Sequence, residues 1–177
     1  MTLTISIIAI ALLVAFISYR QSLEKKKYKE STYLSNLQQI SSFFDTIQSL
    51  NDYTTWVERY QIKLKYSALG KYFKRKTNYY KKEEAVKKFN NIFSDFDNFI
   101  VEYNKNYVRE QKEKLRQYFD NVEGKKLDDQ QITSIITDEY SNLIIAGAGS
   151  GKTLTILGKV KYLIEQKNVK PENILLL

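Results

Sequence analysis

The sequence predicts a mixed α/β chain: an N-terminal transmembrane helix, a helical hairpin or bundle, and then the first βαβ unit of an incomplete parallel sheet. Three observations lead to this prediction. Residues 3–19 carry no charge, apolar residues between positions 34 and 107 recur at steps of three and four, and a glycine-rich turn at 146–151 joins an apolar run to a helical pattern.

Length and composition limit what the chain does. Its 177 residues hold one ordinary domain or a small domain with an appendage. With 43% hydrophobic and 27% charged residues, the chain is neither disordered in composition nor embedded in a membrane throughout. The absence of Cys and His excludes thiol nucleophiles, zinc fingers and His-centred triads. The net charge of +8 is uneven, because residues 20–126 carry +9 and residues 127–177 carry −1.

The first predicted domain, residues 1–19, contains the uncharged run at 3–19. A helix of this length reaches roughly 26 Å, within the range found for spans of a ~30 Å hydrocarbon core. Basic residues at 20, 25–27 and 29 follow the run, which predicts a single-pass protein of the cell membrane with its C-terminal side in the cytoplasm. A cleaved signal peptide is the main alternative, but no basic residue precedes the run and no small-x-small site follows it. A buried helix of a soluble protein is the second alternative.

Residues 20–123 form the second predicted domain, a basic helical region. Its apolar stripe predicts two or more amphipathic helices that pack as an antiparallel hairpin or bundle. Turns are expected near Gly70 and at Asn51–Asp52. A coiled coil with a partner gives the same stripe, and the sequence does not separate the two.

A basic segment lies within this region. Between Lys63 and Lys88 there are ten Lys or Arg residues, with five aromatic residues among them: Tyr66, Tyr72, Phe73, Tyr79 and Tyr80. One interpretation is a surface for nucleic-acid phosphates, with rings available to bases, or for anionic lipid headgroups. The alternative is a solvated, Lys-rich helix face without a ligand.

The third predicted domain, residues 124–177, begins at Gly124, where the residue pattern of the sequence changes. Asp128 to Asp138 is expected to be a short helix that Asp128 or Asp129 caps. We expect strands at 142–145 and 174–177, and between them a helix from Lys152 to about residue 165.

The turn between the first strand and this helix predicts a phosphate-binding loop. Glycines allow successive backbone amides to point inward at the positive end of a helix, where they hold an anion. Lys152 is expected to reach the β- and γ-phosphates of ATP, and the Thr153 hydroxyl to ligate Mg²⁺. The expected site residues of the loop are Ala146, Gly147, Ala148, Gly149, Ser150, Gly151, Lys152 and Thr153. Ala146 replaces the first glycine of the usual pattern.

The segment Leu127-Asp128-Asp129-Gln130-Gln131-Ile132, placed upstream of this loop, resembles the Q motif of superfamily 1 DNA helicases of the Rep/UvrD type. The sequence at 107–123 is most similar to the lead-in of helicase IV-like members, and 168–177 is similar to the approach to the next helicase motif. The resemblance implies a UvrD-like, RecA-like ATPase domain, ATP and Mg²⁺ as cofactors, and DNA as partner. It implies that Gln131 reads the adenine edge, since an amide both donates and accepts hydrogen bonds.

The chain lacks two parts that this family needs for catalysis. Its only Asp-Glu pair, Asp138-Glu139, precedes the loop, so the later pair that holds Mg²⁺ and positions water is missing, as are the arginines that contact the γ-phosphate. We therefore expect the N-terminal part of a helicase, which binds nucleotide at most. Another class of P-loop ATPase and a membrane-anchored helical adaptor with a relic loop are the alternatives.

Overall fold

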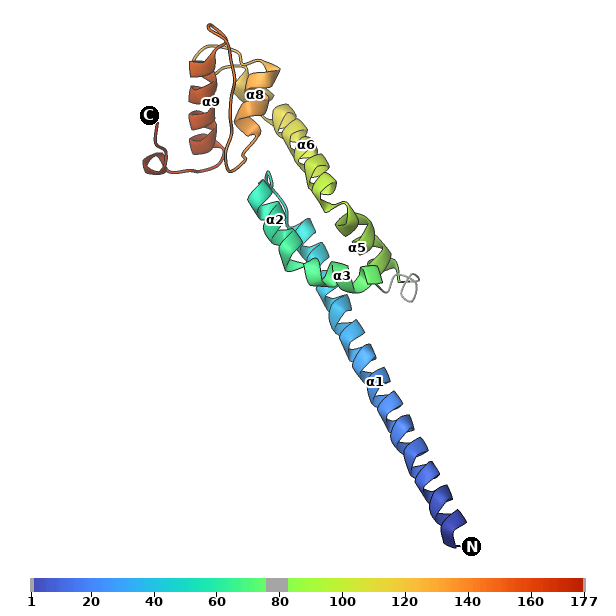
Figure 1. Ribbon diagram of the computed structural model, residues 1–177. Coiled ribbons are helices and arrows are strands. Elements are labelled where there is room, and N and C mark those ends of the chain that lie inside the picture. Colours follow the sequence, from blue (N-terminus) through green and yellow to red (C-terminus); the bar gives the residue numbers. More distant parts are fainter. Residues whose placement is uncertain (1, 76–82, 177) are drawn as a thin grey trace. The chain divides into compact units, whose positions relative to one another are not determined.

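The computed structural model describes the backbone of residues 2–75 and 83–176, and the side chains of these residues outside 2–12, 25–28 and 75. The described elements are all helical (Figure 1). Their bounds are α1 (Thr2–Gln48), α2 (Trp56–Lys65), α3 (Ser67–Arg75), α5 (Glu84–Ser94), α6 (Phe96–Lys114), α7 (Arg116–Phe119), α8 (Asp129–Ile136), α9 (Lys152–Glu165) and the 3-10 turn η1 (Pro171–Asn173).

Two helices begin with reciprocal caps. At α2, the Thr55 side chain accepts from the Glu58 amide at 3.2 Å, and the Glu58 carboxylate accepts from the Thr55 amide at 2.8 Å. At α8, Asp128 is the cap residue, as expected from the sequence, and Gln131 completes the pair. Such caps satisfy amides that have no carbonyl of a preceding turn, so both helix starts are encoded locally.

One of the two compact units of the chain comprises residues 1–47 and 68–90. Its core is aromatic and aliphatic, with the rings of Phe43 and Phe89 meeting edge to face at 5.0 Å between centroids and Phe73 at 6.1 Å from Phe89. Ile40, Leu69 and Val86 complete this buried core.

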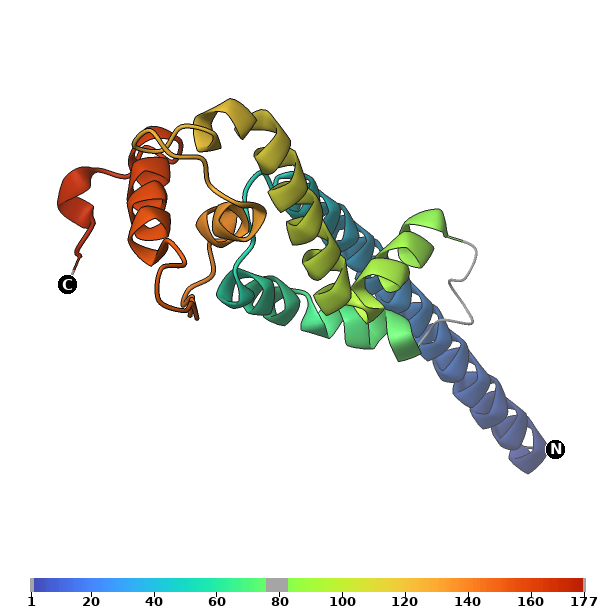
Figure 2. The same cartoon turned by 90° about the horizontal axis from the view of Figure 1, so that it is seen from above.

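Residues 48–67 and 91–177 form the other unit, which contains the predicted phosphate loop. Helix α8 lies between α6 and α9 in this unit (Figure 2). Its buried core consists of Tyr107, Phe119, Val122, Leu127, Ile135, Ile136 and Tyr162. Residues 48–67 and 91–123 therefore belong to the same compact unit as the loop, although the chain between them does not. The predicted domain ranges 1–19, 20–123 and 124–177 stay predictions.

The predicted α/β fold is wrong for the part of the chain that the structure describes. Neither 142–145 nor 174–176 is a strand, and the β-bridge found among the described residues is the isolated antiparallel pair of Val122 and Lys125. The predicted helix between the two runs is confirmed as α9. A strand exists only through hydrogen bonds to another strand, and a parallel pair is normally buried on both faces. The first run is instead open to solvent, with Leu143 86% and Ile145 89% exposed.

The predicted transmembrane helix and the single-pass location are wrong as well. Over the described residues, no helix combines the length and the apolarity that a bilayer crossing requires. Residues 3–12 of the predicted span lie outside the described side chains. Helix α1 does not end where the uncharged run ends: it continues without a break into the charged residues Arg20 and Glu24, which the core of a bilayer excludes.

The turn expected near Gly70 is also wrong, because Gly70 lies inside α3. The turn at Asn51–Asp52 is confirmed by the break between α1 and α2. Glycine in a helix costs about 1 kcal/mol relative to alanine, which packing elsewhere in a helix readily offsets.

Candidate nucleotide-binding site

The predicted phosphate loop runs directly into α9, whose first residue is Lys152. Two of its glycines adopt left-handed backbone conformations, Gly149 with φ of 75° and Gly151 with φ of 78°. This conformation costs other residues about 1–2 kcal/mol each, which explains why glycine stands at both positions. The amides of residues 151–153 belong to the start of α9, where no preceding turn supplies carbonyl acceptors. The donor set suits a polyphosphate.

Lys152 closes the loop on itself. Its Nζ donates to the carbonyls of Ala146 and Gly147, each at 2.9 Å. The Ser150 hydroxyl donates to the Gly147 carbonyl as well, at 2.8 Å. The loop is therefore folded around the positively charged Lys152 ammonium, which can attract an anionic ligand. Both Lys152 and Thr153 are exposed residues.

Gln131, the predicted adenine reader, lies beside the loop. Its Nε2 donates to the carbonyl of Ser150 at 3.3 Å. The structure thus brings together two motifs that are nineteen residues apart. Ala148 and Thr153 are exposed in the same loop region. Among the described residues, no cluster of three or more His, Cys, Asp or Glu side chains forms a metal site.

The Asp138-Glu139 pair has structural partners. The Asp138 carboxylate accepts from Lys159 Nζ at 2.9 Å. Glu139 accepts from the amide of Trp56 at 2.9 Å and from the Tyr53 hydroxyl at 3.1 Å. A carboxylate at the first turn of α2 is stabilised by the positive helix end. Both acidic residues therefore hold helices in place and are not directed to the phosphate loop.

Lys159 and Lys167 are structural residues that the sequence did not single out. Lys159 Nζ donates to the carbonyls of Ile135 at 2.8 Å and Thr137 at 3.2 Å, where α8 ends. Lys167 Nζ pairs with Asp52 and donates to the Tyr107 hydroxyl at 2.8 Å. A lysine in a mostly basic chain carries no local signal for such distant partners.

Among the ionisable groups of this unit whose pKa is shifted, two lie in the segment before α2. Burial raises the pKa of Tyr53 to about 12, and the Glu139 charge adds to this shift. For Asp52, burial acts to raise the pKa, but the hydrogen bonds from Lys167, Tyr107 and the Tyr53 amide outweigh it and the pKa is lowered. The shift of Tyr53 thus follows from its burial, and that of Asp52 from its hydrogen bonds.

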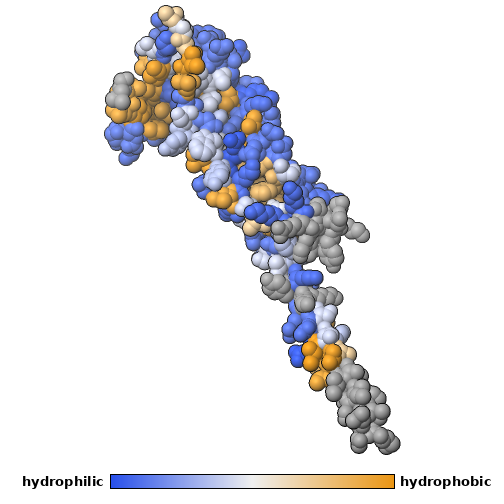
Figure 3. All heavy atoms as spheres, in the orientation of Figure 1, coloured by the Kyte–Doolittle hydropathy of each residue, from blue (hydrophilic) through white to orange (hydrophobic). Residues whose placement is uncertain are grey.

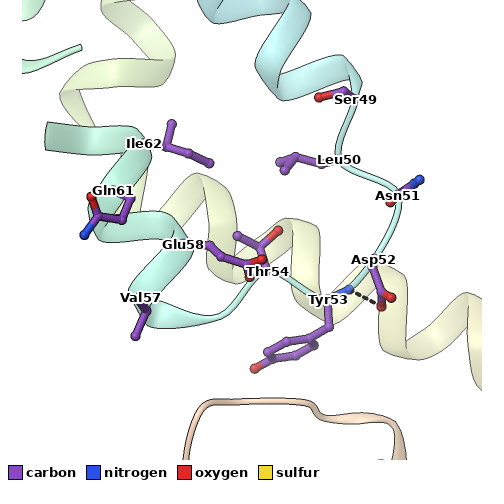
Figure 4. Close-up of a pocket in the computed structure, with 10 residues that line it drawn as sticks. All are labelled: Ser49, Leu50, Asn51, Asp52, Tyr53, Thr54, Val57, Glu58, Gln61 and Ile62. Atoms are coloured by element: carbon purple, nitrogen blue, oxygen red, sulfur yellow. Dashed lines mark hydrogen bonds between the residues drawn. The ribbon is translucent and has the colours of Figure 1, made fainter. Parts of the chain in front are cut away.

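A pocket of 420 Å³ lies at this segment, lined by residues between Ser49 and Ile62 (Figure 4). The amide of Tyr53 donates to the carboxylate of Asp52 at its edge. None of its lining residues belongs to the phosphate loop. The pocket is therefore separate from the candidate nucleotide site.

The basic segment Lys63–Lys88 is only partly described, since residues 76–82 and the side chain of Arg75 lie outside the described residues. Tyr66 and Phe73 are buried, so their rings are core residues and are not available for bases. Lys63 pairs with Asp97. Nothing in the described part of this segment supports a lipid surface.

Comparison with known proteins places the resemblance at the C-terminal part of the chain. The family model described as the UvrD/REP helicase N-terminal domain matches residues 127–177. DNA helicase IV of Escherichia coli is 31% identical over 94 residues, which are 53% of this chain and 14% of that protein. A probable DNA helicase II homolog of Mycoplasma capricolum is 49% identical over 49 residues, 28% of this chain and 7% of that protein.

ATP-dependent DNA helicase PcrA of Staphylococcus epidermidis is 42% identical over 55 residues, 31% of this chain and 8% of that protein. The chain thus spans a small part of the length of these relatives. No solved structure is significantly similar to it. The expected relationship to Rep/UvrD helicases is confirmed over part of the chain, since residues 127–177 match the UvrD/REP helicase N-terminal domain.

Proposed function

We propose that this chain is the N-terminal, ATP-binding part of a UvrD-like DNA helicase. The observation that carries the proposal is the loop itself. Two glycines in left-handed conformations, Gly149 and Gly151, flank Ser150 immediately before the first turn of α9. A loop of this form presents several amides to one anion at the positive end of a helix.

Each part of the nucleotide is bound by different residues. The amides of residues 149–153 and the Lys152 ammonium bind the phosphates, and the Thr153 hydroxyl ligates Mg²⁺. Gln131 forms hydrogen bonds with the adenine edge. When bound, ATP supplies the phosphoanhydride bond whose hydrolysis powers a helicase. The relatives named above are DNA helicases, so DNA is the expected partner of the whole protein.

This chain alone is expected to bind ATP without hydrolysing it. Hydrolysis needs a carboxylate that positions the attacking water and holds Mg²⁺. Asp138 and Glu139 are engaged with Lys159 and with the start of α2. We expect phosphate release from Mg·ATP to stay at the level of the buffer.

Calorimetric titration of the full chain with Mg·ATP tests the proposal. Lys152→Ala removes a charge-assisted hydrogen bond to phosphate, worth about 1.5–3 kcal/mol, so affinity should fall roughly ten- to hundredfold. Lys170→Ala is the matched control, because it removes the same charge from an exposed residue outside the loop. Equal affinities of Lys152→Ala and the wild-type chain would refute an ATP site at this loop.

A further inference from the structure

The side chain of Gln131 is held at both ends of its amide. Its Oε1 accepts from the Asp128 amide at 2.8 Å, and its own backbone amide donates to the Asp128 carboxylate at 2.8 Å. This pair is the cap of α8. At the other end, Nε2 donates to the Ser150 carbonyl at 3.3 Å. One side chain therefore links the start of α8 to the phosphate loop.

The bond to Ser150 sets the orientation of one peptide plane in the loop. The Ser150–Gly151 peptide is trans, so its carbonyl and its N–H point in opposite directions. With the carbonyl directed to Gln131, the Gly151 N–H is directed away from it. That N–H is one of the donors expected to hold a phosphate, and its direction depends on the contact with Gln131.

Gly151 is shaped for this contact. A Cβ added at Gly151 would lie 2.5 Å from Gln131 Nε2, closer than two such atoms approach. The positive φ of Gly151 explains why glycine caps α9. The close contact shows that any side chain at this position would also displace the Gln131 amide. The loop and Gln131 fit each other without an intervening group.

Hydrogen-bond capacity remains for a base. A Gln amide has two N–H donors and an oxygen with two acceptor sites. In Gln131 one donor is used by Ser150 and one acceptor site by the Asp128 amide. One N–H donor and one acceptor site on the oxygen are left. The two bonds already made determine on which side of the side-chain amide the nitrogen and the oxygen lie.

We propose that Gln131 is a positioning residue of the phosphate loop, in addition to its expected role at the adenine. The inference rests on the proposed function, since it assumes that the loop binds ATP. It assigns to Gln131 a contribution to the binding of the phosphate chain that does not pass through the base.

Inorganic tripolyphosphate separates the two roles, because it carries the phosphate chain and no base. Titration of the full chain with Mg·tripolyphosphate and with Mg·ATP is compared for wild type and Gln131→Ala. Loss of one hydrogen bond that orients the loop should weaken tripolyphosphate binding roughly two- to tenfold. ATP binding should weaken further, because the base contact is lost as well.

Asp128→Ala is the control for the helix cap. It removes the reciprocal bond of the cap but leaves Gln131 Nε2 and the Ser150 carbonyl in place. Its tripolyphosphate affinity should stay within about twofold of wild type, with a loss of thermal stability similar to that of Gln131→Ala. Circular dichroism establishes the helix content of each variant.

A second variant serves if Gln131→Ala loses its helices. Gln131→Glu keeps an acceptor for the Asp128 amide and lacks the donor for Ser150. Its added charge also repels phosphate, so Gln130→Glu, with the same charge on the exposed neighbour, is compared with it. A tripolyphosphate affinity lower for Gln131→Glu than for Gln130→Glu is the expected result.

The outcomes are distinct. If wild type binds neither ligand, the proposed function is overturned and the inference with it. If wild type binds both, and the Gln131 variants weaken ATP alone, the residue reads the base and does not position the loop. A matching loss of tripolyphosphate affinity in Asp128→Ala would also overturn the inference, because the effect would then come from the helix cap.

Discussion

Gly158 determines how closely α9 packs on α8. It is a buried residue in the middle of α9. A Cβ built on it would lie 2.8 Å from Ile135 Cδ1 and 3.2 Å from Leu127 Cδ1. Ile135 is fully buried in the core of this unit, so its Cδ1 has little space to move aside. Gly158→Ala should therefore overpack this core.

Two opposing effects decide the magnitude. Alanine gains about 1 kcal/mol over glycine in a helix interior. An extra methyl group in a well-packed core costs about 1–3 kcal/mol. The contact at 2.8 Å is shorter than normal van der Waals contact, which places the cost above the gain. We expect Gly158→Ala to lower the free energy of unfolding by about 1 kcal/mol.

The matched control removes Ile135 Cδ1, the atom that the added methyl group would meet. Ile135→Val deletes Cδ1 and should cost about 0.5–1.5 kcal/mol by itself. In the Ile135→Val background, the methyl group added by Gly158→Ala fills the space that Cδ1 occupied, and alanine keeps its higher helix propensity. The double variant should therefore be more stable than the sum of the single changes by about 1–2 kcal/mol.

Urea unfolding of the full chain, followed by circular dichroism, measures this coupling for the wild type and three variants. The linear dependence of the unfolding free energy on urea gives each stability. Additive effects, or a stabilising Gly158→Ala in the wild-type background, would contradict the close approach of α9 and α8.

Three further predictions concern stability and association. Lys159→Met should lower the unfolding free energy by about 1–2 kcal/mol in urea unfolding, because it strips the carbonyls at the end of α8 of their charged donor. The lowered pKa of Asp52 makes its contribution to stability present above pH 3.8 and lost as the pH falls through the folded value; Lys167→Met should flatten this acid limb in unfolding curves measured across pH. Hydrophobic side chains gather on the surface near the C-terminal segment (Figure 3). Leu143 and Ile145 are also exposed, and changing both to Lys should reduce self-association in size-exclusion chromatography with light scattering without lowering the melting temperature.

Local sequence was sufficient for several parts of the candidate site. The start of α9 at Lys152 follows from the glycines before it, whose conformations only glycine adopts at low cost. The cap at Asp128 follows from a side chain that bonds amides within three residues. The match to the UvrD/REP helicase N-terminal domain is local too, since it covers residues 127–177 alone.

Only the tertiary structure decided the remaining features, because each depends on groups distant in the chain. The apolar runs at 142–145 and 174–177 predicted strands, but a strand needs partners that no local pattern supplies. Lys167 finds Asp52 across 115 residues, and Glu139 reaches the start of α2 across 83. The contact of Gln131 with the loop arises in the same way, since packing of α8 against α9 brings the two motifs to hydrogen-bonding distance. Residue type and spacing along the chain determine which conformations are accessible, whereas the partner of each polar group is chosen by the packing that buries the core.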